Sequence, residues 1–280
     1  MTGVVGRFAP SPSGPLHFGS VVTAVASFLD ARAQGGRWLL RIDDLDPPRI
    51  AVGATDRILA TLEALALEWD GAVVYQSARS EAYAQALAQL LEGEQAYRCR
   101  CARKDLGAGP YPGTCRQADL SATGARLAWR VRVDDHAIRI NDCVQGEYVQ
   151  RLAQHCGDFV VRRADGVYAY HLAAVVDDAW SGVTHITRGS DLLESSPGKC
   201  ICSACWACRP PATPICRSCW TPMATNSASR PTRRQWTDQV RAARCFRPWI
   251  FSASHHRSRW WAPRLRSCWP GHCRAGVCLR

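Results

Sequence analysis

Short apolar runs and amphipathic segments alternate along the first part of the chain. Residues 4–9 (VVGRFA) and 37–44 (RWLLRIDD) are short runs that predict strands, and the second run ends in two acids. Residues 18–33, between these runs, have the length and periodicity of a helix. A strand, a helix and a second strand in this order predict a βαβ unit.

The alternation continues to about residue 197. In residues 54–69 four apolar side chains fall on the one stripe that a core-facing helix presents: Ile58, Leu62, Leu65 and Trp69. Residues 80–95 predict a further helix, and residues 127–133 and 183–189 predict strands. Residues 158–171 predict a hairpin that turns at Asp165 and Gly166. Strands that alternate with helices predict an α/β fold with a doubly wound parallel sheet, which binds ligands at the carboxyl ends of its strands.

A turn-rich stretch, GRFAPSPSGPLHFGS (residues 6–20), joins the first strand to the first helix. The start of a helix offers free N–H groups and the positive end of the helix dipole, and both suit a phosphate. Gly19 allows the backbone to approach a ligand closely, and His17 is placed to donate a hydrogen bond to a phosphate oxygen. The alternative interpretation is that His17 only caps the helix.

The composition changes near Pro197. Residues 1–197 hold 20 basic and 23 acidic side chains, whereas residues 198–280 hold 15 basic and one acidic, so the net charge of +11 comes from the second part. That part also holds ten of the 15 cysteines and seven of the 11 tryptophans. The chain begins without a secretory pattern and has no run of the roughly 18 apolar residues that a membrane span needs. We therefore expect a cytoplasmic protein that does not bind membranes.

Three motifs in order resemble the class I glutamyl-type aminoacyl-tRNA synthetases. LHFG (residues 16–19) corresponds to their HIGH motif, RIDDLDPPR (41–49) resembles the acidic segment that follows, and YAYHLAAVVDDAWSGVTHITRGSDLLESS (168–196) resembles a later active-site block. The resemblance covers residues 4–197. It implies a Rossmann-type catalytic domain and, within the family, it points to the short paralogues that lack the anticodon-binding half.

The resemblance implies a reaction and its partners. ATP, accompanied by Mg²⁺, would activate glutamate to the adenylate, and glutamate would then pass to the queuosine base in the anticodon of tRNA(Asp). The protein is expected to be a monomer. The expected domains are residues 1–98 and 117–197 for the catalytic domain, 99–116 for a zinc-binding insert, and 198–280 for an aberrant tail.

The resemblance also assigns site residues. The positions that match glutamate contacts are Arg7, Ala9, Ser11, Asp43, Tyr170 and Arg188. The positions that match ATP contacts are Pro10, His17, Gly19 and Ser20, of which His17 and Gly19 are the catalytic pair. Asp43 would receive the substrate ammonium where family members often carry Glu, and an arginine such as Arg188 can clamp a carboxylate through two hydrogen bonds. The alternatives are a strand-end surface charge for Arg188 and a packed hairpin aromatic for Tyr170.

A second cluster of candidate ligands lies in CRCARKDLGAGPYPGTCR, residues 99–116. Three thiols from Cys99, Cys101 and Cys115 are fewer than the four ligands of a usual structural zinc site, so a reduced cluster without metal is the alternative. The resemblance implies one structural Zn²⁺ held by these cysteines and by Tyr111, because the short paralogues carry a Cys-x-Cys…Tyr-x3-Cys site. Cys143 and Cys156 lie elsewhere, and we expect them to be core thiols.

The tail permits two interpretations. Cys200, Cys202, Cys205, Cys208, Cys216 and Cys219 include two pairs with the spacing of a zinc knuckle, which would make the tail a basic metal- and RNA-binding module. The other interpretation is a shifted reading frame. In one choice of codons, the family's ATP motif KLSKQT becomes NSASRP when read one base later, and NSASRP stands at residues 226–231. GKCICSACWAC (198–208) can likewise come from RQVHLQRLLGL.

We favour the shifted frame, which would leave the chain without the KLSK lysine and its activity in doubt. A tail with so much positive charge and no periodic apolar face is expected to be disordered. Two other functions stay open: a binding module on a synthetase core that does not catalyse, and a zinc- or RNA-binding protein that uses the tail. Glutamate-dependent ATP–pyrophosphate exchange separates the first from the enzyme, and metal stoichiometry separates the second.

Overall fold

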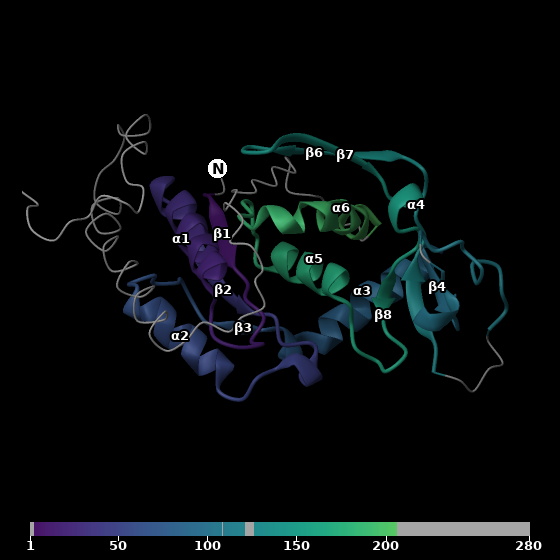
Figure 1. Cartoon of the computed structure of the whole chain (residues 1–280), viewed down its shortest axis with the longest axis horizontal. Coiled ribbons are helices and arrows are strands. Elements are labelled where there is room, and N and C mark those ends of the chain that lie inside the picture. Colours follow the sequence, from purple (N-terminus) through teal and green to yellow (C-terminus); the bar gives the residue numbers. More distant parts are fainter. Residues whose placement is uncertain (1–2, 108, 121–125, 206–280) are drawn as a thin grey trace, which may run out of the picture.

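The computed structural model describes residues 3–107, 109–120 and 126–205 (Figure 1). It confirms the predicted βαβ unit, in which β1 (Val5–Phe8) and β2 (Arg37–Ile42) run parallel and α1 (Phe18–Ala33) connects them. A short strand, β3 (Val74–Tyr75), pairs in parallel with the other edge of β2. The loops that follow β1 and β2 therefore leave the same edge of the sheet.

Trp38 on β2 is the centre of the first core. Its side chain is fully buried, and its ring stacks on Phe8 of β1 at a centroid distance of 6.3 Å. Phe28 of α1 meets the same ring edge-on at 5.3 Å, and the indole Nε1 donates to Ser27 Oγ at 2.9 Å. Burial of these aromatic surfaces, together with the satisfied indole N–H, holds α1 against the sheet.

Helix α2 (Ala54–Ala64) is shorter than the predicted 54–69. The chain leaves the helix at Ala66, which adopts a left-handed conformation with φ 55°, and Leu67 N–H then donates to the carbonyl of Leu62 at 3.0 Å. This is the geometry of a Schellman stop, with alanine where glycine is usual. It turns Leu67 into the core, where its side chain is fully buried, and it leaves Trp69 outside the helix.

The middle of the chain adds antiparallel strands. Helix α3 (Ser80–Glu92) begins where it was predicted and ends before the predicted residue 95. The strands β4 (Ala96–Cys99), β5 (Ala128–Val131) and β8 (Val160–Arg162) form a sheet in the order β4-β5-β8. Three of these elements were not predicted: β4, the hairpin of β6 (Ala137–Asp142) and β7 (Gly146–Arg151), and the short helix α4 (Leu152–His155). The hairpin lies next to α6 in Figure 1. Short 3-10 turns occur at Pro47–Arg49, Gln76–Arg79, Arg103–Asp105 and Ser190–Ser195.

Two cysteines differ from expectation. Cys143 lies between β6 and β7 and Cys156 directly follows α4, and both are exposed rather than core thiols. The hairpin that carries Cys143 is largely exposed, and Cys156 adjoins a surface hollow next to Tyr111. Position in a peripheral element therefore decides the exposure of these thiols, against the usual burial of free cysteine.

The predicted hairpin over 158–171 is correct only at its turn. Arg163 N–H donates to Val167 O at 2.8 Å across the turn, and Arg162 pairs with Tyr168 in a single antiparallel bridge. The second arm then becomes α5 (Tyr170–Trp180), a helix that the sequence analysis missed. Its apolar face enters the second core, between α3, β8 and α6, where Leu172 and Tyr83 of α3 are fully buried.

The predicted strand over 183–189 does not form. The N–H groups of Thr184 and His185 both donate to the carbonyl of Val5, at 2.9 and 3.1 Å, and Val5 N–H donates to Thr184 Oγ1. Because one carbonyl accepts both bonds, the segment lies beside β1 without building a ladder. It leads from α5 to Arg188, so this placement brings the later motif back to the first strand.

The first residues of the predicted tail are folded. Helix α6 (Ser196–Cys205) includes residues 198–205, which we had assigned to a disordered tail, and it packs on α5 and β6. Ser196 and Pro197 begin the helix, where proline is tolerated, and Cys202 is fully buried in the second core. The expectation of disorder for residues 206–280, the knuckle ligands Cys208, Cys216 and Cys219, and the shifted motif at 226–231 all lie outside the described residues.

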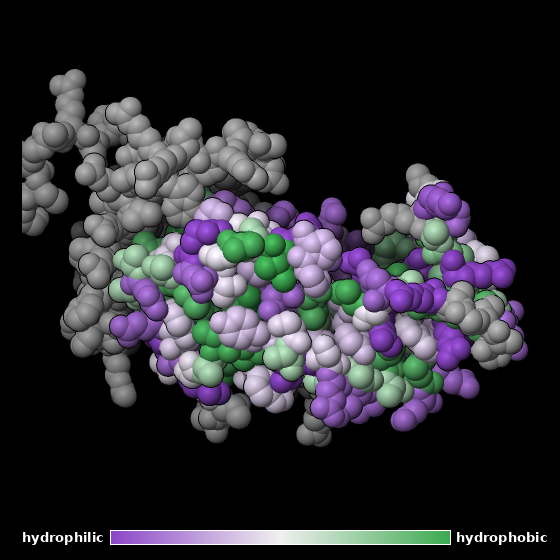
Figure 2. All heavy atoms as spheres, turned by 90° about the horizontal axis from the view of Figure 1, so that it is seen from below, coloured by the Kyte–Doolittle hydropathy of each residue, from purple (hydrophilic) through white to green (hydrophobic). Residues whose placement is uncertain are grey.

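A helix that crosses a membrane needs a long and apolar run of residues. None of the helices in the described ranges combines the length and the apolar character needed to cross a bilayer. On the face drawn in Figure 2, hydrophobic residues occur in separate patches among hydrophilic ones. The apolar surface on this face is therefore divided rather than continuous.

Gly157 joins the segment of residues 99–116 to the rest of the fold. Its φ is +63°, and a Cβ built on it would lie 2.4 Å from the carbonyl oxygen and 2.7 Å from the nitrogen of Tyr111. The preceding carbonyl, of Cys156, accepts a hydrogen bond from Tyr111 N–H at 2.9 Å. Only glycine permits this close contact between the two backbones.

We predict that Gly157→Ala destabilises the protein by about 3 kcal/mol or more, because the methyl group overlaps fixed backbone atoms in addition to the strain of positive φ. Gly182→Ala is the matched control. Gly182 has φ +67°, and a Cβ added to it would meet nothing within 4 Å, so it should lose only about 1 kcal/mol. Urea unfolding measures both, and equal losses would contradict the assigned role of Gly157.

Candidate active site and metal centre

The loops after β1 and β2 meet at the carboxyl edge of the parallel sheet. Pro10 carbonyl accepts a hydrogen bond from Asp43 N–H at 3.0 Å, which ties the two loops together. Ala9 is half-buried and Ser11 is exposed in this loop. The carboxyl edge is where an α/β sheet binds its ligands, and the predicted positions Ala9, Pro10, Ser11 and Asp43 all lie at this edge.

His17 caps α1. Its Nδ1 accepts from Ser20 N–H at 3.2 Å, so the proton of the neutral ring lies on Nε2, which is 3.0 Å from Ser20 Oγ. A Cβ at Gly19 would be 3.2 Å from this ring, which explains the glycine: it lets the imidazole fold over the helix start. Both His17 and Ser20 are accessible to a ligand, and Nε2–H would have to turn from Ser20 to a phosphate oxygen to serve as its donor.

A chain of buried ion pairs lies behind this edge. Arg7 on β1 donates to both carboxylate oxygens of Asp178 on α5, at 3.0 and 3.1 Å. Arg41 on β2 donates to Asp178 at 2.6 Å and to Asp43 at 2.6 and 3.3 Å. The side chains of Arg7, Arg41 and Asp43 are at most 7% exposed, and that of Asp178 is 13% exposed. The predicted glutamate contacts Arg7 and Asp43 thus belong to one network, connected by two residues that the sequence analysis did not assign.

Asp178 is the shared acceptor of that network. Burial alone would raise the pKa of its carboxyl, but the guanidinium groups of Arg7 and Arg41 outweigh this and hold the pKa well below its ordinary value. Its neighbour Asp177 serves a different purpose, since it accepts from Gln76, Arg79 and Tyr83 at 2.9, 2.5 and 2.7 Å. In the sequence these two residues are visible as adjacent acids, Asp177 and Asp178, within an otherwise apolar segment.

Tyr170 and Arg188 complete the predicted glutamate set. Tyr170 is the first residue of α5 and is 38% exposed, so the alternative of a packed hairpin aromatic is wrong. Loss of solvent at its hydroxyl end raises the pKa of that group, with Arg7 and Asp43 among the charges that act on it. Arg188 is 5% exposed and donates through Nη2 to Ser196 Oγ, so the alternative of a surface charge is wrong. Lys199 of α6, which the sequence analysis did not assign, donates to the Tyr170 hydroxyl at 2.9 Å.

The electrostatic contacts gather four predicted residues into one cluster. The charges of Arg7 and Asp43 act on Tyr170, and those of Arg188 and Arg7 act on Lys199. Arg7, Asp43, Tyr170 and Arg188 therefore share one charged environment. The predicted ATP residues Pro10, His17, Gly19 and Ser20 lie along the loop and helix start that follow Arg7.

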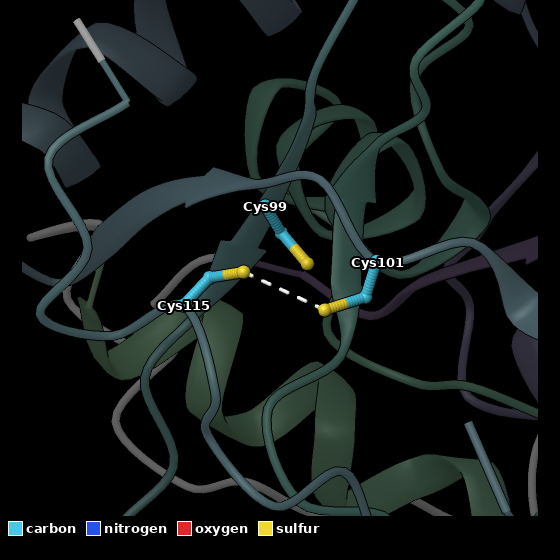
Figure 3. A group of neighbouring side chains, drawn as sticks. All are labelled: Cys99, Cys101 and Cys115. Carbon is cyan, nitrogen blue, oxygen red and sulfur yellow. Dashed lines mark hydrogen bonds between the residues drawn. The ribbon is translucent and has the colours of Figure 1, made fainter. Parts of the chain in front are cut away.

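The candidate metal ligands converge as predicted (Figure 3). The three thiol sulfurs of Cys99, Cys101 and Cys115 lie within 4.8 Å of one another, and the Tyr111 hydroxyl is 3.4 Å from Cys99 Sγ and 3.6 Å from Cys101 Sγ. A tetrahedral zinc site with Zn–S bonds of about 2.3 Å has sulfurs about 3.8 Å apart. The donor set therefore fits a tetrahedral ion in both number and separation.

The donors of the cysteine cluster differ in how readily they ionise. Burial raises the pKa of the Cys115 thiol, but hydrogen bonds from the Arg100 backbone and from Tyr111 outweigh it and lower the pKa to about 7. Arg130 Nε is 3.2 Å from Cys99 Sγ, and its guanidinium lies 3.9 Å from the centre of the Tyr111 ring. By contrast, burial raises the pKa of the Cys101 thiol and of the Tyr111 hydroxyl, so these two donors would ionise only with a metal ion bound.

Buried Asp158 positions this cluster. It accepts from Arg116, the residue after Cys115, at 2.6 and 2.5 Å, and from Val133 N–H at 2.8 Å. Its backbone carbonyl accepts from Arg130 at 2.6 Å. The same residue therefore orients the chain at one thiol and the guanidinium beside another.

Comparison with known proteins identifies the relatives of this chain. The family model described as tRNA synthetases class I (E and Q), catalytic domain, matches residues 3–109 and 114–229. The glutamyl-Q tRNA(Asp) synthetase of Pseudomonas putida (strain GB-1) is 56% identical over 195 residues, which are 69% of this chain and 65% of that protein. The protein of the same name from Thiobacillus denitrificans is 56% identical over 201 residues, 69% of this chain and 66% of its own length.

The fold has solved counterparts. The crystal structure of a glutamate tRNA ligase from Elizabethkingia meningosepticum in complex with its amino acid has a TM-score of 0.69 at 24% identity, over 84% of this chain and 53% of that one. The match thus covers about half of the solved chain. At this identity the likeness shows the shared fold.

The ion pairs of Asp178 lead to a prediction on stability. Asp178→Asn leaves two buried guanidinium groups without their shared carboxylate, so we expect a loss of about 3–5 kcal/mol in the free energy of unfolding. Because the pKa of Asp178 is lowered in the folded state, its contribution is present above its ordinary value of 3.8 and is lost as the pH falls through the folded value.

Denaturant unfolding between pH 7 and about pH 2 measures both effects, because the contribution of Asp178 declines only below its ordinary pKa of 3.8. Glu147→Gln is the control, because the pair of Glu147 with Arg139 is exposed and should contribute less than about 1 kcal/mol. A similar small loss for Asp178→Asn would show that the network does not depend on this carboxylate.

Proposed function

The chain belongs to the class I tRNA synthetases (E and Q), and on this basis we propose that it activates glutamate with ATP and transfers it to queuosine in tRNA(Asp). The observation that carries the proposal is the cluster of Arg7, Asp43, Tyr170 and Arg188 at the carboxyl edge of the parallel sheet. The names of the relatives at 56% identity support the glutamate and the tRNA(Asp) of this proposal. The matched stretch spans 65% of the Pseudomonas relative, so the activity of the whole relative is part of the proposal.

The proposed reaction has two steps. A carboxylate oxygen of glutamate attacks the α-phosphorus of ATP, and pyrophosphate leaves with Mg²⁺ as its counterion. A hydroxyl of queuosine then attacks the acyl carbon, its proton is lost, and AMP leaves. Asp43 would hold the substrate ammonium, and Arg188 and Arg7 would attract its carboxylates. His17 Nε2–H and the N–H groups at the start of α1 would donate to the phosphates.

We further propose one structural Zn²⁺ on Cys99, Cys101, Tyr111 and Cys115. The fit of the donor separations to a tetrahedron supports this assignment. Zinc in this position would cross-link the two ends of the 99–116 segment. All four donors belong to the protein, so the ion would stabilise the fold rather than act on the substrate.

We also propose that the reading frame is shifted after Pro197. The break in charge and cysteine content at that point supports this. The alignments with the relatives, of 195 and 201 residues, are about as long as the part of the chain before it. The family match continues to residue 229, so this match alone does not mark the boundary. Lys104 and Lys199 are the only lysines of the chain, so residues 206–280 offer none for the KLSK position. A lysine at that position would neutralise charge on the transferring phosphate.

We predict that Arg188→Ala abolishes glutamate-dependent ATP–pyrophosphate exchange in a frame-corrected chain. Loss of the buried partner of a carboxylate costs about 2–5 kcal/mol, which corresponds to a fall of about 30-fold or more. Arg188→Lys, which keeps the charge without the fork, should retain part of the activity. Arg139→Ala, in the exposed hairpin, is the control and should leave exchange unchanged.

Comparison of natural and frame-corrected chains tests the function itself. If the frame-corrected chain catalyses glutamate-dependent ATP–pyrophosphate exchange and the natural chain does not, the result supports both the synthetase activity and the shifted frame. Equal exchange by both chains would reject the shift. Glutamate binding without exchange by either chain would favour the binding module.

We predict one zinc per chain, lost in Cys115→Ser and retained in Cys156→Ser. Cys156 is an exposed thiol outside the cluster, so it controls for removal of a cysteine as such. Metal content of the purified variants, measured by atomic emission, checks this. A stoichiometry above one that survives Cys115→Ser would revive the tail as a metal-binding module.

A further inference from the structure

Arg130 places a buried guanidinium group beside the cysteine cluster. It lies on β5 directly opposite Tyr97 of β4, so its side chain is on the same face of the sheet as Cys99, two residues farther along β4. Residues in this diagonal relation across an antiparallel pair are within reach of a long side chain. Arg130 is 8% exposed, and its Nε donates to Cys99 Sγ at 3.2 Å. The pairing of the two strands therefore brings the guanidinium to a candidate metal ligand.

Two further contacts fix the plane of this guanidinium. Its Nη1 donates to the backbone carbonyl of Asp158 at 2.6 Å, and its central carbon lies 3.9 Å from the centre of the Tyr111 ring. Cys99 and Tyr111 are two of the four proposed zinc donors, so one cation contacts half of the donor set. A planar group with contacts through two nitrogens and one face keeps a single orientation.

The charge of Arg130 has no carboxylate partner in the part of the chain that the structure describes. No carboxylate oxygen there lies within 4.0 Å of its guanidinium nitrogens. Asp158 offers it only a backbone carbonyl, since the carboxylate of Asp158 accepts from Arg116 at 2.6 and 2.5 Å and from Val133 N–H at 2.8 Å. A buried cation is costly unless an anion pairs with it, and the groups beside Arg130 that can become anionic are the metal donors.

The proposed zinc site lacks the positive charge that Arg130 carries. Three thiolates and a phenolate have four negative charges, and a divalent ion leaves two of these uncompensated. A hydrogen bond from a guanidinium to a thiolate joins two charged groups and is stronger than one between neutral groups. A buried cation without a carboxylate and an anionic metal site therefore stabilise each other.

We propose that Arg130 is a positioning residue for the metal ion, which orients the Cys99 thiolate and the Tyr111 ring and supplies a positive charge to the loaded site. This inference rests on the zinc assignment made with the proposed function and adds a residue on which the affinity for zinc depends. Groups that hydrogen-bond to metal ligands orient them, and their loss typically weakens metal binding by about 10- to 100-fold. Arg130 does not itself bind the ion, because a guanidinium cation has no lone pair to donate.

Competition with a chromophoric zinc chelator, applied to the natural full-length chain and its variants, tests the inference without an assay of activity. Arg130→Met removes the charge and the donors, so it should weaken zinc binding by about tenfold or more. Arg130→Lys keeps the charge without the fork and should recover part of that loss. Arg98→Met is the control, because Arg98 precedes Cys99 but lies on the opposite face of the sheet, over Trp129. Zinc that Cys115→Ser still binds belongs to other cysteines and is subtracted.

Cobalt(II) in place of zinc reports on the Cys99 sulfur itself. A cationic donor withdraws electron density from a thiolate, so its removal should move the thiolate-to-cobalt charge-transfer band to longer wavelength. Arg130→Met should show this shift, whereas Arg98→Met should keep the band of the natural chain. A residue that only packs against the cluster would not move the band.

The outcomes separate the two proposals. Equal zinc affinity in Arg130→Met and in the natural chain, a loss that Arg130→Lys does not lessen, or a loss without a shift of the cobalt band overturns the role of Arg130 and leaves the zinc assignment standing. A natural chain that binds no zinc, or whose zinc all survives Cys115→Ser, rejects both. If Arg130→Met does not fold, the neutral variant Arg130→Gln replaces it in both measurements. Natural affinity and a natural band in Arg130→Gln then overturn the inference.

Discussion

The carboxylate of Asp178 is the group on which the rest of the site depends. It accepts hydrogen bonds from Arg7 on β1 and Arg41 on β2, and it lies on α5, so one buried anion joins the parallel sheet to the second core. Without it, two guanidinium groups on neighbouring strands would repel each other in a place with little water. With it, Arg41 also holds Asp43, and the loop after β2 is fixed against the loop after β1. Tyr170 begins the same helix, so its distance from the sheet is set by the same ion pair.

The spacing of apolar residues and turns predicted helices and strands well where contacts between neighbours in the sequence decide the structure. The bounds of α1 agree residue for residue, because its apolar face and the turn at Gly35 are both visible in the sequence. The end of α2 was missed because its left-handed stop is Ala66 rather than glycine. The segment 183–189 was predicted as a strand from its alternation, but a ladder needs successive partners, and here two N–H groups share the carbonyl of Val5. Tertiary hydrogen bonding of this kind has no local signal.

Only the site residues that lie within the family motifs could be predicted from the sequence. Arg7 and Arg188 follow from the resemblance, and the structure buries both. Asp178 was visible as one of two adjacent acids, but the helical pattern does not tell which of them meets the arginines and which meets Gln76 and Tyr83. Lys199 was missed because its segment was set apart as tail on composition. Composition describes a whole segment, whereas one turn of helix can still pack against the core.

The two sites have opposite electrostatic requirements. In the proposed zinc site, three thiolates and a phenolate would carry four negative charges, of which a divalent ion offsets two and Arg130, 3.2 Å from Cys99 Sγ, offsets one more. In the candidate active site, Arg7 and Arg41 pair with Asp43 and Asp178, and among the described residues no carboxylate oxygen lies within 4.0 Å of Lys199 Nζ. Each site is therefore incomplete in charge rather than in shape. Because charge compensation in a buried site depends steeply on the ligand's charge, a neutral analogue of similar size should be rejected more strongly than a larger ligand of the right charge. Under the proposed function, selection of glutamate would then need no tight steric fit around its side chain.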